Sequence, residues 1–330
     1  MNDLYSGPPL DPAVFESASV PVRTLAVTER LRREGASAPA LSAARIRELR
    51  RSSPGAAGVL RAEPPSELAV EHLIDGPAGS LRLRVLRSGE VRACYLHLHG
   101  GGWALGGADQ QDQTLLRFAS AARVAVVSVE YRLAPEYPHP AAVADSVAAI
   151  RWLAANAEGE LGAARLIVAG ESAGAHLAAL ALLVLRDRGE LAAVAAANLA
   201  YGVYDLSMTP SARGWGDQRI VTSTQDLAFF AEQYAPSERH RDADVSPLYA
   251  DLTGLPHALF SCGTLDPLLD DTLFMAARWQ AAGSEAQLAI YPGAPHEFLN
   301  LRDPISAEQQ ARKRMIGFIE HVLTSDVPAA

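Results

Sequence analysis

The sequence predicts an α/β fold built on a mostly parallel sheet of eight strands. After residue 89, segments that are apolar throughout alternate with helices, which is typical of parallel strands covered on both faces. Before that point, two segments of alternating apolar and polar residues flank a glycine-containing turn, which predicts an antiparallel hairpin. The expected strands are residues 68–74, 81–86, 93–99, 124–130, 165–170, 194–201, 257–263 and 287–291.

Helices are expected in the longer segments between these strands, at residues 113–122, 141–157, 173–188, 271–282 and 308–323. The segment from Tyr201 to His257 is too long for a simple connection and contains a further expected helix at 224–234. We therefore expect an insertion there, over the carboxyl edge of the sheet. Residues 1–64 have helical and loop character, and two prolines mark their end.

Composition and charge limit the classes of function. Hydrophobic residues make up 49% of the 330-residue chain and charged residues 20%, so the chain can bury a large core. The formal net charge of -9 would repel a polyanion, which argues against nucleic-acid binding. The N-terminus lacks the pattern of a signal peptide, and no apolar run is long enough to span a bilayer. We expect a cytoplasmic protein.

Two of the expected strands end in motifs typical of nucleophilic catalysis. The strand at 93–99 runs into Gly100, Gly101 and Gly102, and three consecutive glycines can turn tightly and present bare N–H groups to a cavity. The strand at 165–170 continues as Gly-Glu-Ser172-Ala-Gly before a helix, the context in which a serine hydroxyl is exposed. Together they predict acyl transfer through a covalent serine intermediate, and the alternative is a plain strand-to-helix turn.

A serine hydroxyl needs a base to take its proton. His296 follows the last expected strand in a loop rich in glycine and proline, where it can reach the carboxyl edge of the sheet. His139, which is flanked by prolines, is the alternative base.

The base needs an acid to hold its tautomer and to stabilise the imidazolium. Asp266 directly follows the penultimate strand and is the candidate. Asp270 and Asp271 are instead expected at the N-terminus of the next helix, where carboxylates favour the helix dipole. The resulting order of serine, aspartate and histidine along the chain is that of α/β-hydrolases.

Five blocks in this order resemble the hormone-sensitive-lipase-like family of α/β-hydrolases, the bacterial HGGG carboxylesterases. The resemblance extends from about residue 68 to the C-terminus, with Glu171 where many members have aspartate before the nucleophile. The blocks are His99–Trp103, Tyr131–Glu136, Gly170–Gly174, Asp266–Leu268 and His296–Phe298.

The resemblance implies an α/β-hydrolase core at 65–202 and 248–330 beneath a helical cap made of 1–64 and 203–247. The N–H groups of Gly101, Gly102 and Ala173 would form the oxyanion hole, and no metal or other cofactor would be needed. The family's strand order would separate Cys94 from Cys262, so both would stay reduced. The side chains expected along the substrate pocket are Trp103, Trp215 and Phe229, and those expected to brace the loop beneath the site are Tyr131, Arg132, Glu136 and Asp145.

These features predict a serine carboxylesterase that hydrolyses short- to medium-chain acyl esters through an acyl-enzyme. The alternatives are a deacylase or acyltransferase that tailors a secondary metabolite, and a non-hydrolytic homologue that binds a small molecule, because fold does not fix function. The expected partner is a small-molecule ester, and the sequence leaves a homodimer open.

Overall fold

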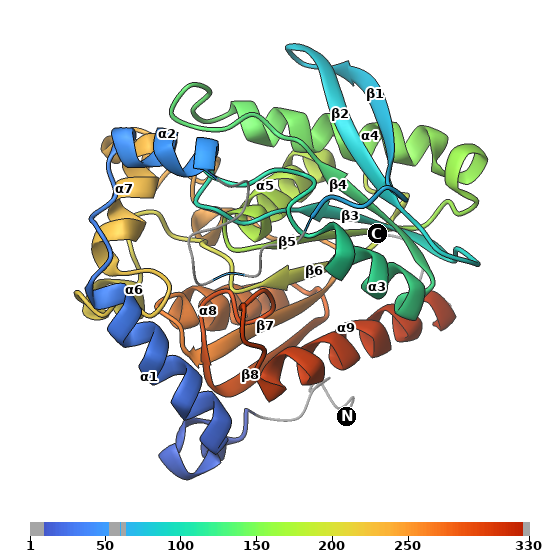
Figure 1. The fold of residues 1–330 in the computed structure, drawn as a ribbon. Helices are drawn as coiled ribbons and strands as arrows, with labels where there is room; N and C mark the ends of the chain where they lie inside the picture. Colours follow the sequence, from blue (N-terminus) through green and yellow to red (C-terminus); the bar gives the residue numbers. More distant parts are fainter. Residues whose placement is uncertain (1–9, 53–59, 61–63, 326–330) are drawn as a thin grey trace.

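An eight-stranded sheet runs through the centre of the molecule (Figure 1). The computed structural model describes residues 10–52, 60 and 64–325, and its strands lie in the order β1-β2-β4-β3-β5-β6-β7-β8. β1 pairs with β2 and β2 with β4 in antiparallel fashion, and all other neighbours are parallel. The predicted fold class is therefore confirmed. The strands are β1 (Val70–Gly76), β2 (Gly79–Leu86), β3 (Ala93–Leu98), β4 (Val124–Val129), β5 (Leu166–Glu171), β6 (Val194–Ala200), β7 (His257–Leu265) and β8 (Ala286–Pro295).

The central strands are apolar throughout because both faces of the sheet are covered. Every residue of β3, β4, β5 and β6 is buried. Successive side chains of a strand point to opposite faces, so Leu96 joins one hydrophobic cluster while its neighbour Tyr95 joins the other.

Helices form a layer on each face of the sheet. The first cluster contains side chains of α4 (Ala141–Leu161), α5 (Ala173–Asp187) and α8 (Leu269–Ala281), and the second contains those of α3 (Asp112–Ala122) and α9 (Ser306–Thr324). α5 is buried along almost its whole length, which explains its run of alanine and leucine. Among the described helices, none is both long and apolar enough to cross a membrane.

At β8 the structure differs from the predicted boundaries, because the strand continues to Pro295 instead of ending at residue 291. Pro292 favours a loop in a sequence-based prediction, but β8 is an edge strand, where the missing N–H of a proline is tolerated. The pairing of β7 with β8 extends to Leu265 and Pro295. Both strands therefore end immediately before Asp266 and His296.

Four helices outside the sheet layers gather on one side of the molecule (Figure 1). α1 (Val22–Ala36) and α2 (Ala43–Ser52) come from the N-terminal segment, and α6 (Pro210–Gly214) and α7 (Thr224–Tyr234) come from the insertion. The insertion also contains the 3-10 helices η3 (Ser237–Arg239) and η4 (Pro247–Tyr249). Residues 1–9, 53–59 and 61–63 of the expected N-terminal cap lie outside the described residues.

The start of the described N-terminal segment lies at the edge of the sheet, where α1 also contacts β8. Its two 3-10 helices, η1 (Pro12–Phe15) and η2 (Ser17–Ser19), pack against β8. Two contacts then join α1 to the insertion. The backbone of Gly35 approaches the carbonyl of Arg219 too closely to accommodate a side chain, and the Arg219 guanidinium donates to the carbonyls of Ala38 and Pro39 at 3.1 and 3.0 Å.

The two cysteines are free and buried, as predicted, because β5 and β6 separate Cys94 on β3 from Cys262 on β7. Burial raises the pKa of the Cys94 thiol to about 12, and it also raises the pKa of Cys262 well above its ordinary value.

We expect the native protein at pH 7 to react only slowly with a thiol reagent. After denaturation without reductant, two thiols should titrate; a count of zero would show a disulfide.

Candidate active site

Ser172 occupies the tight turn between β5 and α5. Its backbone has φ 55° and ψ -119°, a conformation that is uncommon for a residue with a side chain. The flanking glycines permit this turn: a Cβ on Gly174 would lie 1.9 Å from the carbonyl oxygen of Leu98, and one on Gly170 would lie 2.3 Å from the carbonyl carbon of Gly174. The spacing of glycine, serine and glycine is thus required by close contacts of the backbone.

The structure brings Ser172, His296 and Asp266 together. The hydroxyl oxygen of Ser172 lies 2.9 Å from Nε2 of His296, and Nδ1 of His296 lies 2.9 and 3.1 Å from the two carboxylate oxygens of Asp266. Asp266 also accepts the N–H of Leu268 at 2.8 Å. All three side chains are buried. A carboxylate on Nδ1 fixes the proton there and leaves Nε2 free to accept one from the serine.

Two opposing effects set the charge of His296. Burial by itself lowers the pKa of the imidazole, but the charge of Asp266 and its hydrogen bond outweigh burial, so the net effect is to raise the pKa. The protonated, imidazolium form of His296 is therefore favoured.

The three-glycine turn faces Ser172 from the end of β3. Gly101 and Gly102 have φ of 112° and 60°, and the carbonyl of Gly101 accepts the N–H groups of Ala104 and Leu105. The loop therefore turns back on itself, and its Gly101 and Gly102 line the same cavity as Ser172. Ala173 is the first residue of α5, and the first N–H groups of a helix have no partner within it.

Trp103 follows the glycines and is clamped between the insertion and α5. Its ring stacks on that of Tyr234 at a centroid distance of 4.5 Å, and its indole N–H donates to Nδ1 of His176 at 3.1 Å. Nε2 of His176 lies 2.7 Å from the carbonyl of Val245, so the proton is on that nitrogen. Burial lowers the pKa of His176 to about 3, and the ring stays neutral. Trp103 lines the cavity, as expected from the sequence.

His139, the alternative base, is directed elsewhere. Its Nδ1 lies 3.1 Å from the hydroxyl of Tyr234, and its Nε2 lies 3.3 Å from a carboxylate oxygen of Asp244. Both ring nitrogens thus have partners in the insertion, and the structure does not bring His139 to Ser172.

A cavity of about 660 Å³ opens above the serine. Its walls come from the core, from α1 and α2, and from the insertion, and most of the lining is apolar. Arg50 on α2 holds one wall in place, because it donates to the carbonyls of Ala104 and Ala134 at 2.7 and 2.5 Å and pairs with Glu136. The lining side chains from the insertion include Leu206, Met208, Leu227 and Phe230.

Two side chains expected along the pocket do not line it. The wall contains Phe230 and not its neighbour Phe229, because successive residues of an α-helix point about 100° apart. Trp215 is half-buried at the edge of a hydrophobic cluster, and its indole N–H donates to the carbonyl of Gln218 at 2.5 Å. The aromatic residues of the sequence indicated the segment that lines the cavity, but they did not indicate that Phe230 is the one that faces it.

Asp270 and Asp271 lie in the first turn of α8, as predicted. Their carboxylates also accept hydrogen bonds from the insertion. Asp270 accepts the N–H of Ser211 at 2.8 Å, and Asp271 accepts the N–H groups of residues 204 and 205 and the hydroxyl of Thr209 at 2.6 to 2.9 Å. Burial raises the pKa of Asp271 to about 7. These carboxyls hold the insertion on the core.

Three polar side chains form a cluster behind Ser172, and two of them, Gln111 and Asn300, belong to no motif. Glu171 accepts the side-chain amides of Gln111 and Asn300 at 3.0 and 2.5 Å. Gln111 precedes α3, and its position depends on residues far away in the sequence. Gln111 and Asn300 give no local sequence signal, because they meet Glu171 only after the strands have paired.

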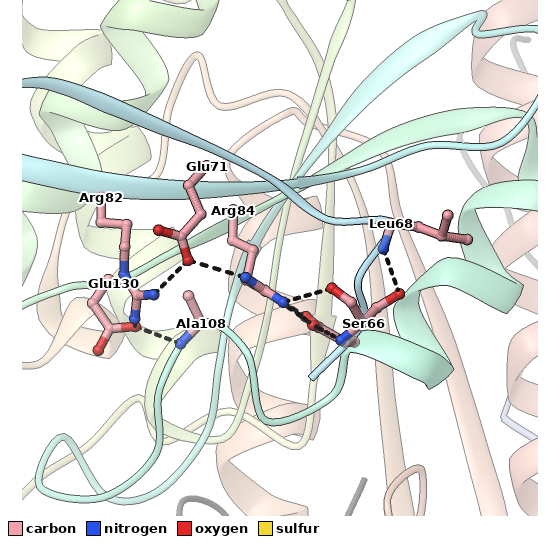
Figure 2. Close-up of polar contacts among 8 residues, drawn as sticks. Ser66, Leu68, Glu71, Arg82, Arg84, Ala108 and Glu130 are labelled. Atoms are coloured by element: carbon pink, nitrogen blue, oxygen red, sulfur yellow. Dashed lines mark hydrogen bonds and ion pairs between the residues drawn. The ribbon is translucent and has the colours of Figure 1, made fainter. Parts of the chain in front are cut away.

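Figure 2 shows how the chain before α3 is held. Arg84 on β2 donates to the buried carboxylate of Asp112, which also accepts the N–H of Ser66 at 2.6 Å. Glu130 accepts the N–H of Ala108 at 2.8 Å and pairs with Arg82. The segment from residue 108 to 112 is therefore fixed at both ends.

The arrangement agrees with comparisons to known proteins. A family profile for the alpha/beta hydrolase fold matches residues 95–300. The chain is 37% identical over 237 residues to the carboxylesterase NlhH of Mycobacterium tuberculosis, which covers 69% of this chain and 73% of the relative. The chain belongs to the hormone-sensitive-lipase-like carboxylesterase family.

Further members of the family extend the likeness. An ethyl acetate hydrolase of Pseudomonas putida is 36% identical over 214 residues, which are 63% of this chain and 67% of that protein. The crystal structure of a hormone-sensitive lipase from a metagenome library has a TM-score of 0.77 and 28% identity, and the match covers 92% of this chain and 100% of that one. The predicted family is thereby confirmed.

The two candidate bases can be separated by labelling with a small serine-directed organophosphate. We expect His296→Ala to lower the labelling rate by about 100-fold or more, because the base raises the nucleophilicity of the serine. His139→Ala should change the rate only a few-fold. Mass spectrometry would follow the adduct; a large loss in His139→Ala with normal labelling of His296→Ala would contradict this assignment.

Proposed function

We propose that this protein is a serine carboxylesterase that hydrolyses short- to medium-chain acyl esters through an acyl-enzyme. One observation carries the proposal: the hydroxyl of Ser172 is 2.9 Å from Nε2 of a histidine whose other nitrogen is held by a buried carboxylate. The names of the relatives, carboxylesterase and ethyl acetate hydrolase, support ester hydrolysis.

In the first half of the reaction, the Ser172 oxygen attacks the ester carbonyl while His296 takes its proton. Asp266 stabilises the imidazolium formed in this step. The carbonyl oxygen becomes an oxyanion, to which the N–H groups of Gly101, Gly102 and Ala173 donate. Each such donor is often worth ~3 kcal/mol of transition-state stabilisation. When the intermediate collapses, His296 returns its proton to the leaving alcohol, and the acyl group stays on the serine.

In the second half, a water molecule replaces the alcohol. His296 takes a proton from the water as the water oxygen attacks the acyl carbonyl, and the same N–H groups receive the second oxyanion. The proton then passes to the oxygen of Ser172, which leaves as the free hydroxyl. The products are the carboxylic acid and the regenerated enzyme.

We assign selection of the acyl-chain length to a cap made of residues 1–64 and 203–247. We also propose that the enzyme is cytoplasmic. The support for the role of the cap is the cavity wall: side chains of the insertion and of α1 and α2 close the space above Ser172. Phe230 packs closely on the three-glycine loop, because a Cβ on Gly102 would lie 2.4 Å from its ring. Inserted segments commonly carry specificity while a rigid core holds the reacting groups.

Removal of the nucleophile tests the mechanism. Ser172→Ala should fold as the parent does and lose about 10⁴-fold or more of its kcat toward p-nitrophenyl esters, because the three residues act as a unit. The control is Ser146→Ala, which should keep its kcat. Ser146 is a buried serine whose hydroxyl donates to the carbonyl of Ala142 on its own helix. A Ser172→Ala variant with a tenth of the parent's kcat would exclude this mechanism.

The adjacent phenylalanines give a matched test of the cap. Phe230→Ala should move the optimum of a p-nitrophenyl ester series toward longer acyl chains, because it widens the cavity beside Gly102. Phe229→Ala removes the same atoms from the neighbouring position and should leave the optimum unchanged. Equal shifts in both variants would show a general loosening of α7 instead of a local effect.

A further inference from the structure

Two buried carboxyl groups flank the proposed catalytic residues. Glu171 directly precedes Ser172, and Glu297 directly follows His296; they are 7% and 6% exposed. The side-chain nitrogen of Asn300 lies 2.5 Å from an oxygen of Glu171 and 3.2 Å from an oxygen of Glu297. The two carboxyls therefore meet at one amide group.

The two carboxyls differ in their other partners. Glu171 also accepts the amide of Gln111 at 3.0 Å, and Nε2 of His97 lies 3.8 Å from its second oxygen. For the carboxyl group of Glu297, the only hydrogen bond among the described residues is the one from the side chain of Asn300. Within the same ranges, no arginine or lysine forms an ion pair with either carboxyl. The donors are therefore concentrated on Glu171.

Few charges are available to balance two carboxylates here. The titratable and charged groups that face the pair come from six elements or the loops after them. They are Tyr95 and His97 on β3, His99 after β3, Tyr131 after β4, Tyr201 after β6, Asp266 after β7, His296 after β8 and Arg312 on α9. Two like charges in one buried site cannot both form without a large cost.

The surroundings favour a proton on Glu297 over a proton on Glu171. Burial raises the pKa of Glu171, but His97, Gln111 and Arg312 outweigh it, and the net effect is to lower the pKa. Burial raises the pKa of Glu297 to about 7; His296 opposes this shift and the charge of Glu171 adds to it.

Glu297 is held against the oxyanion loop. An added Cβ on Gly100 would lie 2.5 Å from a carboxyl oxygen of Glu297, so this first glycine of the loop leaves space for the carboxyl. Glu297 lines the cavity, and its backbone has φ 59°, a left-handed conformation that costs energy for a residue with a side chain. The fold therefore holds a carboxyl group between His296 and the loop that would receive the oxyanion.

We propose that Glu171 and Glu297 share one proton at neutral pH, and that neutral Glu297 is a positioning residue that keeps negative charge away from the oxyanion loop and from His296. The inference rests on the proposed esterase function. When the proton leaves to solvent at higher pH, the new carboxylate opposes the oxyanion and favours the protonated, inactive form of His296. Both effects lower the rate.

The test is the pH profile of kcat/KM for a p-nitrophenyl ester between pH 5 and 9. Glu297→Gln keeps the size and the neutral state of the group, so its profile should lack the fall that the parent shows on the alkaline side. The ratio of the variant's kcat/KM to the parent's should rise about tenfold from pH 6 to 9, because one carboxylate beside the reacting groups is removed. A ratio that does not change with pH would overturn the proposal.

A second variant should move the profile in the opposite direction. Glu171→Gln removes the neighbouring charge, so Glu297 should lose its proton more readily and the alkaline fall should begin at lower pH. Glu190→Gln, at the far end of α5 where Glu190 pairs with Arg151, is the control and should reproduce the parent's profile. An alkaline limb that stays in place in Glu171→Gln would show that the two carboxyls are not coupled.

An infrared measurement separates failure of this inference from failure of the proposed function. In Ser172→Ala protein, raising the pH from 6 to 9 should remove a protonated-carboxyl band that is absent from Ser172→Ala/Glu297→Gln. The band needs no turnover. If the band is seen in Ser172→Ala but the parent protein has no esterase activity, only the proposed function is overturned. If the parent is an active esterase but Ser172→Ala lacks the band, the shared proton is overturned.

Discussion

The site depends on one close contact between two backbones. Gly174, in the first turn of α5, approaches the carbonyl of Leu98 so closely that no side chain fits between them. This contact holds the serine turn against the end of β3, and the three-glycine loop continues directly from that strand. The proposed nucleophile and the proposed oxyanion donors are thus placed relative to each other by covalent geometry and hydrogen-bonded strands. Side-chain packing then has only to place His296 and Asp266 beside Ser172.

The parts predicted from sequence are those that need only local information. Apolar strands, glycine spacing and the position of Ser172, Asp266 and His296 at strand ends were enough, because the carboxyl ends of parallel strands meet at one edge. The faces of α7 and the partners of Asp271 could not be predicted, since they depend on how the insertion lies on the core. Gln111 and Asn300 are separated from Glu171 by 60 and 129 positions, and only the strand order brings them together.

Buried carboxyl groups serve different tasks in this molecule, and their partners distinguish them. Asp112 faces a guanidinium and stabilises the chain before α3, whereas Asp271 faces neutral donors and holds the start of the insertion. Both are fully buried and would be unfavourable without those hydrogen bonds. Of the two carboxyls beside the proposed catalytic residues, Glu297 has fewer side-chain donors than Glu171, and Glu297 is the one that lines the cavity.

The stacking of Trp103 on Tyr234 has a consequence for exchanging the insertion of this protein. The insertion ends α7 with a ring that packs on the residue after the three-glycine loop, and the same ring contacts His139 and His176. A foreign insertion transplanted between homologues would therefore have to supply an aromatic ring at this position, or the loop beneath it would lose its support. In this chain, changes in the part of the insertion that precedes Tyr234 leave the ring contact in place, whereas a change at Tyr234 itself reaches the three-glycine loop through Trp103.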